Sequence, residues 1–352
     1  MSKMKVAIIG CGTIAKSAHI PAYMNNKECE IKYFCDILEE RAKEAVEANG
    51  CGTAITDYNI ALNDPEIVAV SVCTPNDAHE FVSIDALKAG KHVLCEKPAA
   101  RTYDDAVKMQ KAAHETGKIL NIGVVNRFNT SVNKIKKMIT DGKLGDIYHV
   151  YISFRAHRSI PGLGGAFTTK IKSGGGVLID WGVHYIDIVM HCLGDPEPRT
   201  VSGKAHSVLG KDIENYTFTG MWAGPPVLDG TYDVDDFVTA FVRTDDTSIT
   251  MNGAWAQNIG IDEGFIDFIG TKGGIRLQYG GDFVFYGVED GNLTELKQKY
   301  QDKEMFQAEI DQFLNAVKTG EKGPSYIDKA IITAKLMQAI YDSSDKNAEV
   351  VL

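Results

Sequence analysis

The first 125 residues alternate short apolar runs with amphipathic stretches, and this alternation constrains the fold more than any other feature of the chain. The apolar runs lie at residues 5–10, 30–36, 67–75, 91–98 and 118–124. Stretches with helical periodicity separate them, at 37–49, 77–89 and 103–116. Strands that are apolar on both faces and alternate with helices are typical of a parallel sheet covered on both sides. The pattern therefore predicts a doubly wound α/β domain over residues 1–125.

The pattern of apolar and polar residues changes after residue 125. A predicted helix at 130–141 is followed by segments in which apolar and polar residues alternate, such as DIYHVYISFRAH (146–157) and DDFVTAFVRT (235–244). Period-two segments joined by turn residues predict strands of an antiparallel or mixed sheet. A loop-rich stretch covers 210–232, and further helices are predicted at 304–318 and 326–343. Residues 126–352 are expected to form an α+β domain with a large open, mainly antiparallel sheet.

Charge and composition argue against several classes of function. The formal net charge is −10, and such a surface repels phosphate backbones and anionic lipid, so no nucleic-acid or membrane partner is expected. No run approaches the roughly 18 apolar residues of a membrane span, and the N-terminus lacks signal-peptide features, which predicts a cytoplasmic protein. The seven cysteines contain no CxxC pair, which favours reduced, buried thiols over a disulfide or metal framework.

A glycine motif, Gly10-x-Gly12-x-x-Ala15, lies between the first strand and a helix. Gly10 permits a tight turn, Gly12 lets the backbone approach a pyrophosphate, and Ala15 allows close helix packing. The helix N-terminus, which includes Thr13 and Ile14, offers free N–H groups to an anion. The motif in this context predicts dinucleotide binding, with a plain glycine turn as the alternative.

The second strand ends at Asp36, 21 residues beyond Ala15. A carboxylate at this position accepts hydrogen bonds from a ribose 2′-OH and repels a 2′-phosphate. NAD is therefore favoured over NADP, although Arg41 nearby would tolerate the phosphate.

Two later strands end in polar sequences at the same carboxyl edge of the sheet, where ligands bind in open α/β folds. CTPNDAH (73–79) places Thr74 and Asn76 there as cofactor contacts, with a proline turn and helix cap as the alternative. CEKPAA (95–100) places Lys97 beside the cofactor, where a lysine between an apolar strand and a proline favours a functional role over a solvated one.

The segment GGGVLIDWGVHYIDIVMHCLG (174–194) reads as a buried helix, yet it contains Asp180, His184, Asp187 and His191. Their spacing of i, i+4, i+7 and i+11 gathers them on one stripe, and burying them unpaired would be unfavourable. An internal polar network explains His191 best and is one reading of Asp187. No HExxH motif or cysteine cluster supports a metal site, so none is predicted. The third reading is an acid/base site, in which Asp180 orients His184.

Several motifs occur in an order and spacing that resemble the Gfo/Idh/MocA oxidoreductases, over nearly the whole chain. They are the GxGxxA start, Asp36, CTPN with His79, GKHVLCEKP, NRF (126–128), GKLGDI and GGGVLIDWGVHYID. The resemblance implies a Rossmann domain followed by a domain whose open sheet forms homo-dimer or homo-tetramer interfaces. It also implies NAD or NADP as cofactor, with Pro75, His79 and Glu96 as further cofactor contacts. The family's catalytic lysine matches Lys97, and its helix aspartate and histidine match Asp180 and His184.

The segment FRAHRSIPGLGGAF (154–167) is expected to supply substrate contacts. Arg155, His157 and Arg158 would hold hydroxyls or an acidic group, although solvated surface roles are equally consistent with the sequence. Trp181 would stack on a sugar ring, as would Tyr185 and Trp255, although aromatic residues more often belong to a core. Asn126 and Arg127 are further candidates, with a structural link between the domains as their alternative.

The leading hypothesis is an NAD-dependent dehydrogenase or reductase acting on a hydroxyl of a sugar, glycoside or inositol. In it, His184 exchanges the hydroxyl proton, Lys97 stabilises the alkoxide and Asp180 binds a hydroxyl or orients the pair. One alternative keeps the fold but retains NAD and oxidises the sugar only transiently, which permits epimerisation, elimination or glycoside cleavage. Another is a non-catalytic, nucleotide-sensing regulator.

Overall fold

The computed structural model describes residues 3–298 and 304–352, and the chain divides into two compact units. Unit 1 comprises Met1–Phe128 and Lys303–Ile331, and unit 2 comprises Asn129–Asp302 and Ile332–Leu352. The sequence predicted that all residues after 125 belong to the second domain, whereas residues 303–331 belong to unit 1. The division differs because helix α9 (Met305–Thr319) packs against α1 (Ile20–Asn25) and the 3₁₀ turn η3 (Val125–Phe128) of unit 1.

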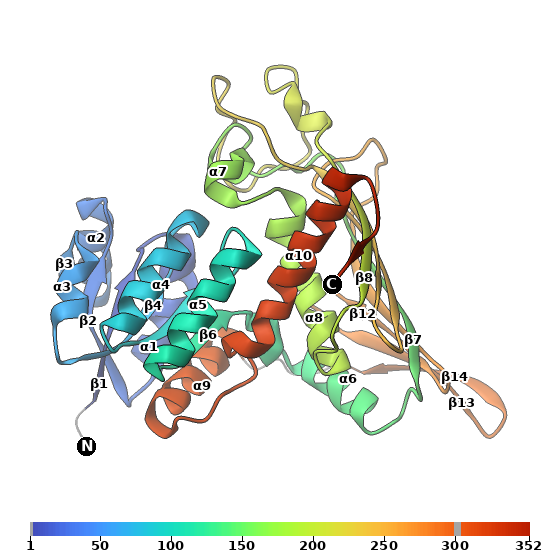
Figure 1. The fold of residues 1–352 in the computed structure, drawn as a ribbon, viewed down its shortest axis with the longest axis horizontal. Helices are drawn as coiled ribbons and strands as arrows, with labels where there is room; N and C mark the ends of the chain where they lie inside the picture. Colours follow the sequence, from blue (N-terminus) through green and yellow to red (C-terminus); the bar gives the residue numbers. More distant parts are fainter. Residues whose placement is uncertain (1–2, 299–303) are drawn as a thin grey trace. The chain divides into compact units, whose positions relative to one another are not determined.

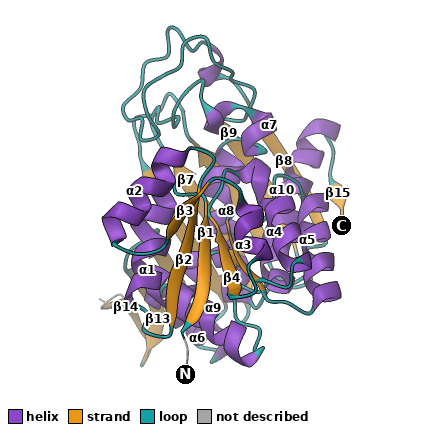
Figure 2. Ribbon diagram, turned by 90° about the vertical axis from the view of Figure 1, so that its left-hand side faces the viewer, coloured by secondary structure: helices purple, strands orange, loops and turns teal. Residues whose placement is uncertain are grey.

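Unit 1 is built on a six-stranded, wholly parallel sheet with strand order β3-β2-β1-β4-β5-β6. Its strands are β1 (Met4–Ile9), β2 (Cys29–Cys35), β3 (Thr53–Ile55), β4 (Ile67–Val72), β5 (His92–Glu96) and β6 (Leu120–Gly123). Its other α-helices are α2 (Glu39–Asn49), α3 (Tyr58–Asn63), α4 (His79–Lys88) and α5 (Tyr103–Thr116). Helices flank the strands on both sides (Figure 2). The doubly wound fold is confirmed, and the short strand β3 is the one strand of this sheet that the sequence did not predict.

Local sequence signals explain where these elements begin and end. The central strand β1 buries Val6, Ala7 and Ile8 completely, as expected for a strand covered on both faces. Helix α5 begins where Thr102 accepts a hydrogen bond from the backbone N–H of Asp105, and it ends at Gly117 in the left-handed conformation. Cap residues and apolar runs together therefore set the element boundaries.

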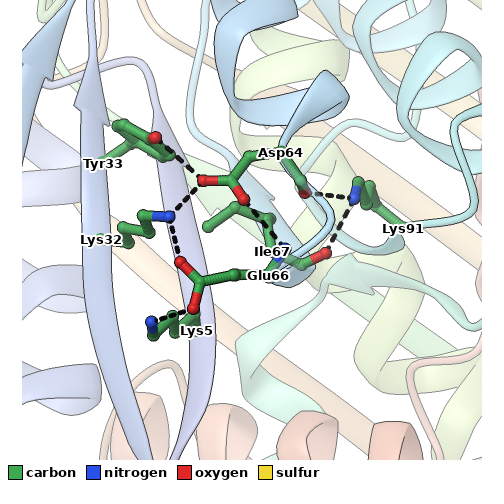
Figure 3. A network of polar contacts seen from close by, with 7 residues as sticks. All are labelled: Lys5, Lys32, Tyr33, Asp64, Glu66, Ile67 and Lys91. Carbon is green, nitrogen blue, oxygen red and sulfur yellow. Dashed lines mark hydrogen bonds and ion pairs between the residues drawn. The ribbon is translucent and has the colours of Figure 1, made fainter.

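A polar network joins β1 and β2 to the segment that leads into β4 (Figure 3). Lys32 contacts both Asp64 and Glu66, and Glu66 also accepts from Lys5. The buried amine of Lys91 donates to the carbonyls of Asp64 (2.7 Å) and Ile67 (2.9 Å). The network ties β1, β2 and the start of β4 together and leaves the carboxyl edge for ligands.

Unit 2 is built on a nine-stranded sheet with strand order β14-β13-β12-β11-β7-β10-β9-β8-β15. Its strands are β7 (Ile147–Arg155), β8 (Thr200–His206), β9 (Phe237–Arg243), β10 (Ser248–Ala254), β11 (Glu263–Gly270), β12 (Gly274–Gln278), β13 (Phe283–Glu289), β14 (Asn292–Gln298) and β15 (Val350–Val351). All neighbouring pairs are antiparallel except β7 and β10. The predicted open, mainly antiparallel sheet is confirmed, whereas β14 and β15 were not predicted.

The helices of unit 2 lie on one face of this sheet (Figure 1). They are α6 (Thr130–Thr140), α8 (Val183–Leu193) and the C-terminal part of α10 (Ile327–Lys346), with the short α7 (Lys170–Ser173) before α8. Strand residues such as Val150, Ile266 and Val238 meet Ile188 and Val189 of α8 in one core cluster. The sheet thus uses one face for the core and leaves the other without a helix among the described residues.

The helical stretch Lys170–Leu193 is long and apolar enough to cross a membrane, which the sequence reading had not recognised. However, 78% of its most apolar window is buried inside the protein. Its hydrophobicity therefore serves the packing of unit 2.

Candidate active site

The glycine motif of unit 1 forms the turn between β1 and the first helix. Gly10 has a φ of +93°, and a Cβ placed there would lie 2.5 Å from the carbonyl oxygen of Cys73. A Cβ on Gly12 would meet nothing within 4 Å, so the fold itself does not require glycine at this position. The open space above Gly12, beside the helix that begins with Thr13 and Ile14, fits a pyrophosphate at the backbone.

Asp36 lies directly beside this turn, at the end of β2. One carboxylate oxygen accepts a hydrogen bond from the backbone N–H of Cys11, inside the motif, at 2.9 Å, and the other accepts from Leu38. A carboxylate has about four acceptor positions, so both oxygens can also accept from a ribose hydroxyl. Asp36 is therefore fixed next to the turn by the backbone that it binds.

The turn after β4 carries Thr74, Pro75 and Asn76. None of the described residues forms a hydrogen bond with the buried hydroxyl of Thr74. A buried hydroxyl without a protein partner is unfavourable unless a ligand or water satisfies it, which fits a bound polar group at this edge.

His79 was predicted as a cofactor contact, and the structure places it in a supporting position instead. One ring nitrogen bonds the carbonyl of Pro98 (2.8 Å) and the other bonds the carbonyl of Thr74 (2.9 Å). Burial by itself lowers the pKa of His79, but Cys95 and the two carbonyls raise it to about 9. The imidazolium thus holds the turns after β4 and β5 together.

Glu96 is also buried, and each of its carboxylate oxygens has a protein partner. Its Oε1 lies 2.7 Å from Nε2 of His19, and its Oε2 accepts from the backbone N–H of Lys97 at 3.1 Å. His19 was missed in the sequence, because its apolar surroundings gave no sign of a partner 77 residues away. Lys97, which is half-buried, follows this fixed carboxylate at the end of β5.

Asn126 and Arg127 lie in η3 and are buried. The Arg127 guanidinium donates to the carbonyls of Pro324 (2.9 Å) and Lys329 (3.4 Å), all within unit 1. Arg127 was predicted as a substrate contact. Its 1% exposure and these hydrogen bonds instead indicate a structural role, in which it links η3 to the segment around Pro324 and Lys329.

In unit 2, the helix predicted from residue 180 begins with a π-helical turn, η5 (Leu178–Gly182), and continues as α8. The predicted stripe assumed α-helical spacing throughout, which is wrong over this turn. A π turn inserts an additional residue and is frequent at functional sites. Asp180 lies in the π turn and His184 in the first turn of α8, and both are half-buried.

Asp235, which the sequence did not single out, anchors the start of this helix. Its carboxylate accepts hydrogen bonds from the backbone N–H groups of Gly176 (2.8 Å) and Leu178 (3.0 Å) and from the hydroxyl of Tyr341 (2.6 Å). A Cβ on Gly176 would lie 1.9 Å from the carbonyl oxygen of Asp235. The glycines before the helix are therefore needed for this close approach.

The other two members of the stripe contact protein groups. Asp187 accepts a hydrogen bond from the Thr333 hydroxyl at 3.1 Å, and His191 lies 3.3 Å from the Lys136 amine. Both are at most 3% exposed. The internal network considered for the stripe describes this pair, while Asp180 and His184 remain the candidates for chemistry.

His184 lines a cavity of about 460 Å³, a size typical of small-molecule sites. Trp181, Tyr185 and Tyr279 supply aromatic surface, while Arg155, Asp262 and Glu263 supply charge. Tyr185 stacks between Phe154 (4.7 Å between ring centres) and Tyr279 (4.6 Å). All of these residues belong to unit 2.

Of the three charged or basic residues predicted as substrate contacts at 155–158, only Arg155 lines this cavity. Arg155 lines it and pairs with Glu263, whereas the guanidinium of Arg158 is bound to Asn258 and to the carbonyl of Thr217. The backbone N–H of His157 donates to Asp262. Trp255, considered as a sugar platform, is completely buried and belongs to the core.

Comparison with known sequences covers both units. Residues 4–124 match an oxidoreductase family with an NAD-binding Rossmann fold, and residues 132–276 match the GFO/IDH/MocA C-terminal domain. D-glucoside 3-dehydrogenase of Escherichia coli K12 is 29% identical, over 100% of this chain and 98% of its own length. 1,5-Anhydro-D-fructose reductase of Ensifer adhaerens is 31% identical, over 67% of this chain and 70% of its own.

Solved structures show the same fold. Levoglucosan dehydrogenase, in a complex with NADH and levoglucosan, superposes with a TM-score of 0.85 at 20% identity, covering 99% of both chains. At 20% identity, this structural similarity shows the fold and gives no information about the substrate.

Proposed function

The chain belongs to the GFO/IDH/MocA family of oxidoreductases, and from this membership we propose that it transfers hydride between NAD and a carbinol carbon of a sugar, glycoside or inositol. The observation that carries the proposal is the position of His184, which lines an aromatic cavity of unit 2 next to the anchored π turn. Relatives named as glucoside and inositol dehydrogenases support the substrate class.

Residues of unit 1 would hold the cofactor. The backbone at Gly12 and the helix start at Thr13 suit the pyrophosphate, Asp36 suits an unmodified ribose, and Thr74 offers a further hydroxyl. NAD, when bound, supplies the hydride acceptor, and NADH the donor. The carboxylate of Asp36 favours NAD over NADP because it would repel a 2′-phosphate.

Three side chains would transfer the substrate's hydroxyl proton and stabilise the charge that its loss creates. His184 takes the substrate's hydroxyl proton during oxidation and returns it during reduction. The ammonium of Lys97 stabilises the negative charge that develops on the substrate oxygen. Asp180 orients His184 or binds a neighbouring hydroxyl. The half-buried positions of the three side chains support these roles, since partial burial strengthens charge interactions while leaving a face for substrate.

We further propose that the protein is a homo-oligomer formed through the helix-free face of the nine-stranded sheet. This face carries Tyr151, Phe241 and Phe265, and the rings of Tyr151 and Phe265 are 5.7 Å apart. Sedimentation of the protein with Phe241→Lys should show a smaller species than the wild type. An unchanged mass would rule out this face as the interface.

The activity is tested with a panel of glycosides, inositols and free sugars, following NADH absorbance with the wild type and His184→Ala in parallel. We expect turnover with at least one neutral polyol and its loss in the variant, with NAD binding retained. Near-normal turnover by His184→Ala would overturn the assignment. NAD that remains bound while sugar is converted without release of NADH would favour transient oxidation.

A further inference from the structure

We propose that the cavity beside His184 selects a neutral polyhydroxylated ring and rejects anionic sugars such as sugar phosphates, uronates and nucleotide sugars. The inference rests on the proposed function, because it specifies the substrate class of the same site. It concerns the charges and ring faces that unit 2 itself presents to the cavity.

The charge of the cavity wall is the first argument. Among the described residues that line it, Arg155 is the one lysine or arginine, and Asp262 and Glu263 are the carboxylates. Both Nε (2.8 Å) and Nη2 of Arg155 donate to Oε1 of Glu263, so this guanidinium is neutralised by a neighbour. Asp262 then leaves the wall with an excess negative charge, which disfavours an anionic ligand.

Glu263 is held in its ionised form. The Ser153 hydroxyl also donates to Oε1, and this bond, together with Arg155, keeps the pKa of Glu263 below its ordinary range. The protein donors that the structure describes converge on one oxygen and leave Oε2 as an acceptor at the cavity. Asp262 similarly uses Oδ1 for the backbone of His157 and keeps Oδ2. Sugar hydroxyls are the donors that such acceptors require.

The aromatic wall is the second argument. Phe154, Tyr185 and Tyr279 form a continuous stack of three rings, anchored at Phe154, which is 1% exposed, and ending at Tyr279, which is 39% exposed. Trp181 adds a further ring to the lining. The negative faces of aromatic rings attract the polarised C–H groups of a pyranose or cyclitol. Carboxylate acceptors and ring faces together fit a neutral ring.

The arrangement of charges around the cavity also indicates how the selectivity can be altered. Replacing Glu263 by Gln keeps the side-chain shape but releases Arg155 from its ionic partner, so an anionic ligand gains a cation to bind. Asp245→Asn is the matched control, because Asp245 forms a similar pair with Arg199 but does not line the cavity.

The test compares a methyl glucoside with the same glucoside carrying a phosphate and with the corresponding uronide. For each, kcat/KM is measured with NAD, and the dissociation constant is measured by titration of the NAD-bound protein. We expect the wild type to prefer the neutral ligand by about 100-fold. Glu263→Gln should reduce this preference at least about tenfold, mainly through KM, while Asp245→Asn leaves it unchanged.

The two measurements separate this inference from the function that underlies it. Equal affinity of the wild type for neutral and anionic ligands, or an unchanged preference in Glu263→Gln, would overturn the inference even if the enzyme is active. A clear preference in binding without any hydride transfer would support the inference and contradict the proposed oxidoreductase activity. A Glu263→Gln protein that fails to fold would show in its melting curve, and Arg155→Gln then replaces it, with a stronger rejection of anions expected.

Discussion

The carboxylate of Asp235 and the backbone N–H of Gly176 are joined by a 2.8 Å hydrogen bond across 59 residues of sequence. The same carboxylate binds the N–H of Leu178, so it satisfies two donors at the start of the helix that carries Asp180 and His184. A residue outside the cavity thereby fixes the position of both candidate catalytic groups.

Replacing Asp235 by Asn should destabilise the protein by about 2 kcal/mol, because an amide NH₂ would face at least one of these N–H groups. We also expect kcat to fall with little change in NAD affinity, since the π turn loses its anchor. Thermal melts and steady-state kinetics measure the two effects. Tyr341→Phe is the control, because it removes only the hydrogen bond from the Tyr341 hydroxyl to Asp235. It should lower the free energy of unfolding by about 1 kcal/mol. Equal kcat in Asp235→Asn and the wild type would remove its positioning role.

The two glycines of the nucleotide motif should respond differently to the same change. Gly10→Ala combines a φ of +93° with a 2.5 Å contact to Cys73, so we expect a loss of at least about 3 kcal/mol of stability. Gly12→Ala meets no protein atom within 4 Å and should leave the melting temperature of the NAD-free protein nearly unchanged. Its affinity for NAD should fall at least about tenfold, as calorimetric titration would show. Normal NAD binding by Gly12→Ala would contradict the placement of the pyrophosphate.

His79 should make stability depend on pH in the alkaline range. Its pKa is about 9 in the folded protein, against about 6.5 in an unfolded chain. The folded state therefore holds this proton more tightly, so the contribution is complete below pH 6.5 and disappears as the pH rises through 9. Denaturation midpoints measured between these values should decline for the wild type and less so for His79→Asn. His206→Asn, at the exposed end of β8, serves as the control, and identical slopes in all three would contradict the prediction.

Lys97 and His184 should behave as one catalytic group if both act on the same substrate oxygen. We expect His184→Ala to lower kcat about 10²–10⁴-fold and Lys97→Ala about 10²–10³-fold. The double variant should be much less impaired than the product of the two losses, because groups that act as a unit are non-additive. Multiplicative losses in a complete double-mutant cycle would assign the two residues to independent roles.

Local sequence signals were sufficient for the fold. The run at 67–75 and the helix at 103–116 were visible because burial and capping are encoded within a few residues, as Thr102 and Gly117 show. The three-residue strand β3 was not visible, since TAI is too short for any periodicity to emerge. The π turn was missed because a wider turn uses the same residues as an α-helix.

Partners distant in sequence limited the prediction of the site. Arg155 was recognised as a candidate, but its pairing with Glu263 depends on the register between β7 and β11. Glu96 was predicted as a cofactor contact, but its partner His19, 77 residues away, was not foreseen. Side-chain types could be read from the motifs, but which of them neutralise one another follows only from strand pairing.

The three tryptophans of the chain all lie in unit 2, in three different surroundings. Trp255 is completely buried, Trp222 is 57% exposed, and Trp181 lines the cavity. Intrinsic fluorescence excited at the indole therefore reports on unit 2 alone, and the Trp222→Phe protein would leave one emitter in the core and one at the cavity. Quenching by iodide or by a bound sugar can then be assigned to Trp181, because the other remaining indole, that of Trp255, is completely buried.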